Sequence, residues 1–370
     1  MKKQPFVVIT LLFAIASGGY LAYRGEPNTD GNAPPALAIL PLTGPSGDLG
    51  KSVYNGMTLA FEAQPPGPGQ RTLKAEDTAG DANRARSIYN QYRSADAPPA
   101  VMSWMSSAAN ALRPLAAEDK RLLFAGAAVP GITQPDGLVV RVWPTAPYIA
   151  ELMAGVVSRD GRQKVAVLYV NDDYGKSVME AFAKQFAANP STIVLSEGFA
   201  ATTADFRSLL AKAAELQVDA IYMPAYGNAY IKFLRQAREQ FGAAFPIYAD
   251  ITLLSKFTLR EIGPEGNGVV ALATVIDLDE QTDPAAKAFV ESHQKRFNAP
   301  PDFNTGLGYA MAHIYLQALS QQAVKPQDFI RGKTFDTPLG KIQYDAQNDC
   351  RVELVPAQLN DGKITRYSPK

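Results

Sequence analysis

Residues 37–61, LAILPLTGPSGDLGKSVYNGMTLAF, predict a buried strand, a turn-rich loop and a helix. Residues 165–186, VAVLYVNDDYGKSVMEAFAKQF, repeat this order with a shorter loop. Both copies contain Gly-Lys-Ser-Val, and apolar residues with i, i+4 and i+8 spacing lie on one helical face. These apolar residues are Val53, Met57 and Phe61 in the first copy and Val178, Phe182 and Phe186 in the second. Because the match is too local for a solenoid repeat, it predicts two α/β lobes that hold a ligand between them.

The composition is compatible with two lobes. A chain of 370 residues, 46% of them hydrophobic, exceeds the size at which one core usually divides into two. The 36 Lys and Arg residues equal the 36 Asp and Glu residues in number, and no long run of one sign occurs. The charge pattern therefore favours neither nucleic acid nor an anionic membrane surface as a partner, and we expect no nucleic-acid partner.

Residues 1–23 read as a secretory signal. Two lysines precede the apolar run at 6–15, and Ala14-Ile15-Ala16 offers a small-x-small cleavage site. Because residues 5–23 carry no charge, the same segment could instead remain as an uncleaved membrane anchor. Either alternative places the rest of the chain outside the cytoplasm, in the periplasm. Residues 24–35, rich in Gly, Pro, Asn and Asp, are expected to form a flexible lead-in.

Groups that carry chemistry are few. The two histidines, His293 and His313, have no second ligand at metal spacing and no catalytic partners in the pattern. The two Gly-Lys-Ser strings lack the upstream glycine of a phosphate-binding loop, so we interpret them as helix starts with a capping serine. The single cysteine, Cys350, cannot form an internal disulfide and is interpreted as a half-buried small residue. We therefore expect a protein that is not an enzyme and that has no cofactor or metal.

Strands and helices alternate along most of the body, which predicts mainly parallel sheets with helices on both faces. We expect lobe 1 to comprise residues 36–144 and 275–336, and lobe 2 to comprise residues 145–274 and 337–367. The chain should cross between them near Pro144, at 272–275 and at 335–339. The fold class is thus α/β, with two Rossmann-like lobes, three hinge crossings and a ligand cleft between the lobes.

Candidate binding groups follow the predicted strands, where ligands bind in open α/β sheets. Ser106 and Ser107 are expected to cap a helix whose free N–H groups and dipole suit a carboxylate. Asp250 follows the strand at 246–249 and could accept hydrogen bonds from a cation. Tyr174 and Tyr226 could close over apolar surface while donating a hydroxyl. Taken singly, these are caps, a solvated acid and rim tyrosines, but their convergence at strand ends favours a site.

With these strings of residues, the chain resembles the type I periplasmic binding proteins of the branched-chain amino acid and amide-binding kind, the extracytoplasmic receptors of ABC importers. The resemblance covers residues 36–367. It is carried by Leu42-Thr43-Gly44-Pro45 with Gly50 and Gly56, Ser106-Ser107 with Pro114, Asp172-Asp173-Tyr174-Gly175, Asp205-Phe206, Asp219-Ala220-Ile221-Tyr222, Tyr226, residues 233–237, and Thr337-Pro338-Leu339-Gly340 with Tyr344-Asp345. It implies two lobes, three crossing segments and a hinge that closes around the ligand.

The resemblance also implies roles for individual residues. Ser106 would hold a ligand carboxylate, Asp250 would pair with an α-ammonium group, and Tyr174 and Tyr226 would close from the second lobe. Two positions differ from amino-acid binders. Ala127-Ala128-Val129 stands where a threonine is common, so Val129 offers no hydroxyl, and Leu49 stands where an aromatic residue is often found. Both changes make the pocket more apolar. Trp104 beside the serines either adds a flat surface to the pocket or packs inside the lobe.

Two functions follow from this interpretation. The first is a solute receptor that delivers a small amphiphile, such as an amino acid, an amide or an aromatic acid, to an ABC permease in the inner membrane. The second is a sensory domain, anchored or not, whose pocket signals instead of transporting. The retained Asp250 favours an amino-acid-like ligand, whereas Val129 favours an amide or an aromatic acid.

Overall fold

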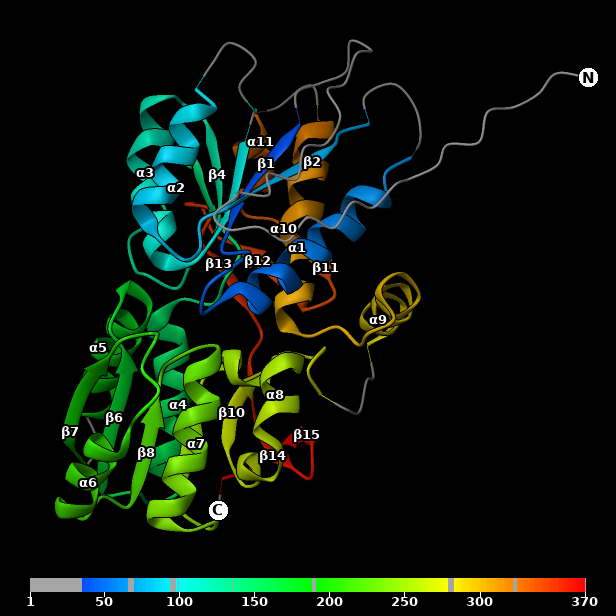
Figure 1. The fold of residues 1–370 in the computed structure, drawn as a ribbon. Helices are drawn as coiled ribbons and strands as arrows, with labels where there is room; N and C mark the ends of the chain where they lie inside the picture. The colour runs from blue at the N-terminus through cyan, green and yellow to red at the C-terminus, as the bar shows by residue number, and fades with distance from the viewer. Residues whose placement is uncertain are drawn as a thin grey trace, which may run out of the picture.

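The computed structural model describes residues 35–65, 70–93, 98, 100–134, 136–187, 191–278, 283–321 and 325–369. The predicted signal or anchor segment and nearly all of the lead-in lie outside these residues. The described chain forms two α/β lobes, one above the other in Figure 1, with the C-terminus in the lower lobe. No helix in the described part of the chain is long and apolar enough to cross a membrane.

Lobe 1, the upper lobe in Figure 1, is built on a five-stranded parallel sheet. Its strand order is β2 (Leu73–Asp77), β1 (Ala36–Leu40), β3 (Ala100–Trp104), β4 (Leu122–Gly126) and β5 (Val139–Arg141). Alternate residues of β1 enter different cores, as strand geometry requires. Leu37 and Ile39 pack with α2 (Ala82–Gln91) and α3 (Ser106–Glu118). Ala38 and Leu40 belong to the core that contains α1 (Gly47–Glu62) and α10 (Phe303–Ser320).

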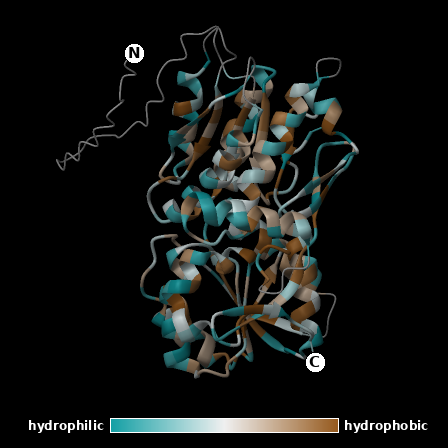
Figure 2. Ribbon diagram, turned by 90° about the vertical axis from the view of Figure 1, so that its right-hand side faces the viewer, coloured by the Kyte–Doolittle hydropathy of each residue, from teal (hydrophilic) through white to brown (hydrophobic). Residues whose placement is uncertain are grey.

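Lobe 2 is built on a seven-stranded mixed sheet. Its order is β7 (Thr192–Phe199), β6 (Lys164–Val170), β8 (Ala220–Met223), β9 (Ile247–Ala249), β10 (Val270–Ala273), β14 (Val355–Asn360) and β15 (Lys363–Arg366). Strand β14 pairs antiparallel with β10 on one side and with β15 on the other. The helices are α4 (Ala146–Arg159), α5 (Asp173–Phe186), α6 (Arg207–Glu215), α7 (Asn228–Phe241) and α8 (Lys256–Ile262), with 3₁₀ turns η1 (Ile251–Leu254) and η2 (Gly263–Gly266). Figure 2 shows hydrophobic residues along strands inside this lobe and many hydrophilic residues on the helices around them. The expected mainly parallel α/β fold is confirmed.

The third passage between the lobes differs from the expected one. Strands β11 (Thr334–Thr337), β12 (Gly340–Tyr344) and β13 (Cys350–Val352) form a separate antiparallel sheet, in which β11 packs against α10 and α9 (Pro284–Phe297). Residues 335–339 are therefore a hairpin and not a crossing, because Thr337 Oγ1 donates to Gly340 O at 2.7 Å and Gly340 adopts φ 91°. The chain changes sheets between β13 and β14, and we place the third crossing at Glu353-Leu354. The short helix α11 (Pro326–Ile330) precedes this sheet.

The first passage contains a helix that the proline pattern concealed. Pro144 marked the expected crossing, and α4 begins directly after Thr145, whose hydroxyl accepts from Tyr148 N. Pro147 lies in the first turn of α4, where a helix needs no N–H from it, so the helix tolerates the ring.

The two copies of the opening motif share one close contact. A Cβ on Gly50 would lie 2.0 Å from Pro41 O, and a Cβ on Gly175 would lie 2.0 Å from Val170 O. Only glycine lets each helix pass the carbonyl at the end of its strand. The serines of these motifs are not caps, as the sequence had suggested. Ser52 and Ser177 lie within the helices, which begin after Ser46 and Asp172, and their hydroxyls donate to the carbonyl four residues earlier.

Candidate functional site

A narrow cleft lies between the lobes, and the space of about 330 Å³ between its walls includes open solvent. We refer to this cleft as the cavity. Every lining residue follows, or ends, a parallel strand or begins the helix after it, so the sheets of both lobes place their strand ends around one space. The lining residues are Trp104, Met105, Ser106, Gly126, Ala128 and Trp143 from lobe 1 and the first crossing, and Asp172, Tyr174, Tyr226 and Thr252 from lobe 2.

The turn between β3 and α3 brings hydrogen-bond donors to the cavity. Ser106 is the first helical residue and not the cap, because the N-cap position belongs to Met105. Met105 has φ 97°, a backbone strain of the kind that clusters at binding sites. Within the described residues no side chain caps α3, and Ser106 Oγ accepts from Ala128 N at 3.2 Å. The Ser106 hydroxyl proton and the first-turn N–H groups can therefore be donated to a ligand oxygen. Ser107 does not line the cavity.

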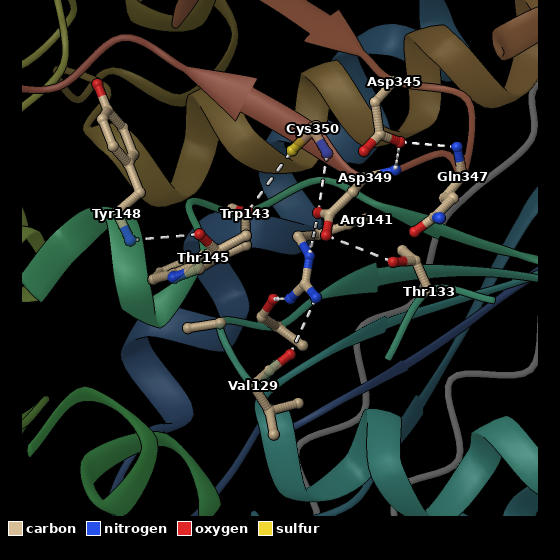
Figure 3. A network of polar contacts seen from close by, with 12 residues as sticks. Val129, Thr133, Arg141, Trp143, Thr145, Tyr148, Asp345, Gln347, Asp349 and Cys350 are labelled. Carbon is tan, nitrogen blue, oxygen red and sulfur yellow. Dashed lines mark hydrogen bonds and ion pairs between the residues drawn. The ribbon is translucent and has the colours of Figure 1, made fainter. Parts of the chain in front are cut away.

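The loop after β4 is held by a buried arginine, as Figure 3 shows. The side chain of Arg141 is fully buried and donates to the carbonyls of Ala127 and Val129 and, at 2.6 Å, to Asp349 Oδ1. The two carbonyls tie the loop to Arg141, Asp349 holds the guanidinium in place, and Ala128 between the two carbonyls lines the cavity. Val129, expected in the pocket, does not line it and contributes its carbonyl to Arg141 instead.

Cys350 supports the same region from β13. It is buried, more so than the sequence indicated, and its thiol donates to Trp143 O at 3.5 Å (Figure 3). Burial raises the pKa of the thiol to about 12, so Cys350 remains protonated and acts as a small hydrogen-bonding residue.

Asp172 is the acid that lines the cavity. Its Oδ1 accepts from Gly175 N at 2.9 Å and thereby caps α5, while Oδ2 accepts from the Tyr226 hydroxyl at 2.5 Å. Burial raises the pKa of Asp172 in spite of these hydrogen bonds. Asp172 belongs to the string Asp172-Asp173-Tyr174-Gly175 that carries the family resemblance, but the sequence did not assign it to the binding residues. Its position directly before the predicted helix was the available signal.

Asp250 lies behind the cavity wall and does not line the cavity. Its carboxylate is fully buried, and its two oxygens accept from the hydroxyls of Tyr174 at 2.6 Å and Tyr222 at 2.5 Å. Burial raises the pKa of Asp250 to about 6, although these two hydrogen bonds act in the opposite direction. The arrangement lets Asp250 orient Tyr174, whose ring lines the cavity. An ammonium group in the cavity would meet Tyr174 before it met Asp250.

Aromatic rings form most of the remaining wall. The centroid of the Trp143 ring lies 6.1 Å from that of Trp104 and 6.5 Å from that of Tyr174, and Tyr174 lies 6.2 Å from Tyr226. Trp104 was anticipated from the sequence and Trp143 was not, because a tryptophan before a proline gives no binding signal. Leu49 is buried in α1 and does not line the cavity.

Neither histidine lines the cavity. Across the described ranges no group of three or more His, Cys, Asp and Glu residues could hold a metal ion. His293 Nδ1 contacts Ala299 O and His313 contacts Gln317, so both histidines are engaged within or beside their own helices. The geometry thus offers oxygen-binding donors, aromatic surface and one carboxylate.

The fold and the cavity define a two-lobed solute-binding protein. Residues 37–355 match the family described as periplasmic binding protein, and the chain belongs to this extracytoplasmic family. The resemblance to type I proteins of the Leu/Ile/Val-binding kind is thereby confirmed. Leu/Ile/Val-binding protein homolog 7 of Brucella abortus (strain 2308) is 25% identical over an alignment of 371 positions that covers 90% of each chain.

Solved structures share the fold. The branched-chain amino acid transporter substrate-binding protein LivJ of Streptococcus pneumoniae, in complex with isoleucine, has a TM-score of 0.81 and 20% identity over 90% of this chain and 97% of its own. An ABC transporter solute-binding protein of R. palustris in complex with benzoate has a TM-score of 0.81 and 19% identity over 90% and 95% of the two chains.

Proposed function

We propose that this protein is the extracytoplasmic solute receptor of an ABC importer and that it binds a small carboxylate with a flat, apolar body. The single observation that carries this proposal is the cavity between the lobes, which combines free donors on one side with aromatic rings on the others. A predicted signal segment would deliver the protein to the periplasm, where it would hand its ligand to a permease in the inner membrane. The homologues, which include transporter substrate-binding proteins, support this role.

The carboxylate end of the ligand is assigned to lobe 1. Ser106 is 2% exposed, and its oxygen already accepts from Ala128 N, which leaves the hydroxyl proton for a ligand oxygen. The uncapped first turn of α3 adds N–H donors and the positive end of the helix dipole. Asp172 on lobe 2 would repel a carboxylate, so the acid end of the ligand points toward α3 and away from Asp172.

The residues that line the rest of the cavity distinguish an aromatic acid from an amino acid. Four lining residues, Trp104, Trp143, Tyr174 and Tyr226, offer flat surfaces, which favour an aromatic acid. An α-ammonium group needs a counter-charge in a closed cleft. Asp250 lies outside the lining, but Asp172 lies within it and favours an amino acid as the second candidate. One structural neighbour binds benzoate and another binds isoleucine.

Calorimetric titration with benzoate, 4-hydroxybenzoate and isoleucine tests the ligand class. We expect saturable binding of a benzoate and at least about tenfold weaker binding by Ser106→Ala, because a charge-assisted hydrogen bond contributes roughly 1.5–3 kcal/mol. Ser107→Ala is the matched control and should bind like the unmodified protein. If only isoleucine binds, the ligand is an amino acid and not an aromatic acid. If none of the three binds, the proposed ligand class is wrong.

A sensory role is the alternative, favoured by one observation. Residues 5–23 are uncharged and long enough to remain as an anchor. Sequencing the N-terminus of the mature protein distinguishes the two roles. A mature chain that begins near residue 17 supports the transport receptor, whereas an intact N-terminus supports an anchored sensor.

A further inference from the structure

Both tryptophans of the chain, Trp104 and Trp143, line the same cavity. Trp143 is 2% exposed, and its indole Nε1 is buried without a hydrogen-bond partner among the described residues. An indole N–H can only donate, and a buried donor without an acceptor costs free energy. Among the described residues that line the cavity, Trp143 is the one whose side chain has such a buried, unpaired group. In native proteins such a group usually pairs with water or with another molecule.

The ring of Trp143 is held in place from both lobes. Phe303, at the start of α10, meets it edge to face at a centroid distance of 4.9 Å, and Tyr174 of lobe 2 meets it edge to face at 6.5 Å. The backbone of Trp143 is fixed by the Cys350 thiol, which donates to its carbonyl (Figure 3). The indole donor is therefore positioned before a ligand arrives, and little side-chain entropy is lost on binding.

We propose that Trp143 is a specificity-determining ligand contact, whose indole N–H donates to an oxygen of the bound acid. This inference rests on the proposed function and deepens it, because it names a donor on the crossing segment in addition to those of α3. A ligand that brings an oxygen to this point pairs a buried group that the protein alone leaves unpaired. A ligand of the same shape without that oxygen leaves the indole unpaired and binds more weakly.

Nuclear magnetic resonance of the ¹⁵N-labelled protein tests this contact directly. Two tryptophans give two indole N–H resonances, and Trp104→Phe identifies the one that belongs to Trp143. On saturation with benzoate, we expect the Trp143 indole proton to move downfield and its exchange with solvent to slow. We also expect Trp143→Phe to weaken benzoate binding about tenfold, whereas the control Ser107→Ala, whose side chain does not line the cavity, should bind benzoate like the unmodified protein.

The possible outcomes separate the contact from the receptor role. If calorimetry shows benzoate binding while the Trp143 indole resonance stays unchanged, the contact is wrong and the receptor role stands. If none of benzoate, 4-hydroxybenzoate and isoleucine binds, the proposed ligand class fails and the contact fails with it.

A second variant removes the donor without changing the shape of the ring. In a Trp104→Phe background, benzothienylalanine incorporated at Trp143 keeps the bicyclic ring and replaces N–H by sulfur. Benzoate binding about tenfold weaker than that of the Trp104→Phe parent supports the hydrogen bond. Binding equal to that of the parent overturns it, even where Trp143→Phe fails to fold.

Discussion

Asp250 supports the cavity wall from behind, through tyrosines that come from three different elements. Tyr174 of α5 and Tyr222 of β8 donate to its carboxylate, and the hydroxyl of Tyr230 of α7 lies 3.2 Å from its backbone N. The sequence located an acid after a strand, but it could not show that tyrosines distant in the chain would enclose it. For this reason the sequence assigned Asp250 a direct contact with the ligand, whereas Asp172 is the acid that lines the cavity.

The buried carboxyl of Asp250 should make stability depend on pH. Its pKa is raised by burial from 3.8 to about 6, so the folded protein binds this proton more tightly than the unfolded chain does. The resulting stabilisation is complete below about pH 4 and is lost as the pH rises through 6. We expect the free energy of unfolding of the wild type, relative to Asp250→Asn, to fall by roughly 2–3 kcal/mol between pH 4 and pH 7.

Urea unfolding of both proteins at four pH values between 4 and 7 measures this difference. Asp277, whose pKa burial also raises to about 6, is present in both proteins, so its contribution cancels. Parallel pH profiles for the two proteins would mean that Asp250 does not titrate in this range.

Two helices of lobe 1 approach each other so closely that their glycines are required. A Cβ on Gly56 of α1 would lie 1.8 Å from Thr305 O, and a Cβ on Gly308 of α10 would lie 1.8 Å from Val53 O. The sequence predicted α1, and the buried residues Val53, Met57 and Phe61 confirm its predicted apolar face. It could not predict the contact between α1 and α10, because about 250 residues, including most of lobe 2, separate Gly56 from Gly308 in the chain. Local patterns indicate the elements, whereas the partner of a helix depends on how the whole chain folds.

Alanine at either glycine should disrupt this helix pair. We expect Gly56→Ala and Gly308→Ala each to reduce the free energy of unfolding by about 3 kcal/mol or more, because the added methyl group meets rigid backbone. Gly155→Ala in α4 is the matched control, since its Cβ would meet only the flexible guanidinium of Arg159 at 3.3 Å.

Chemical denaturation of the three variants provides the comparison. The control should be neutral or gain up to about 1 kcal/mol from better helix propensity. Equal stability of all three variants would contradict the close approach of α1 and α10.

The lobes meet on the side of the cavity away from the crossings as well as at the crossings themselves. Asn110 of α3 donates to Asp173 of α5 through Nδ2 at 2.8 Å, which joins lobe 1 to lobe 2. At the crossings, Leu354 N lies 3.4 Å from the Tyr148 hydroxyl, so the first and third connections are adjacent. The sequence predicted two lobes and three crossings from its repeat and its family resemblance. The third crossing was misplaced because a proline turn resembles a hinge until its strands are seen to pair.

Introducing a negative charge at Asn110 tests the hinge motion expected for the whole molecule. Asn110→Asp would place two carboxylates opposite each other, and their repulsion should favour separation of the lobes. We expect benzoate affinity to fall about fivefold, roughly 1 kcal/mol for partly exposed charges, and the radius of gyration without ligand to increase in small-angle scattering. The exchanged pair, Asn110→Asp with Asp173→Asn, restores one donor and one acceptor and should recover both values. Because salt screens exposed charges, the defect of the single variant should also shrink at 1 M NaCl. A single variant with unchanged affinity and scattering would show that this contact does not control closure.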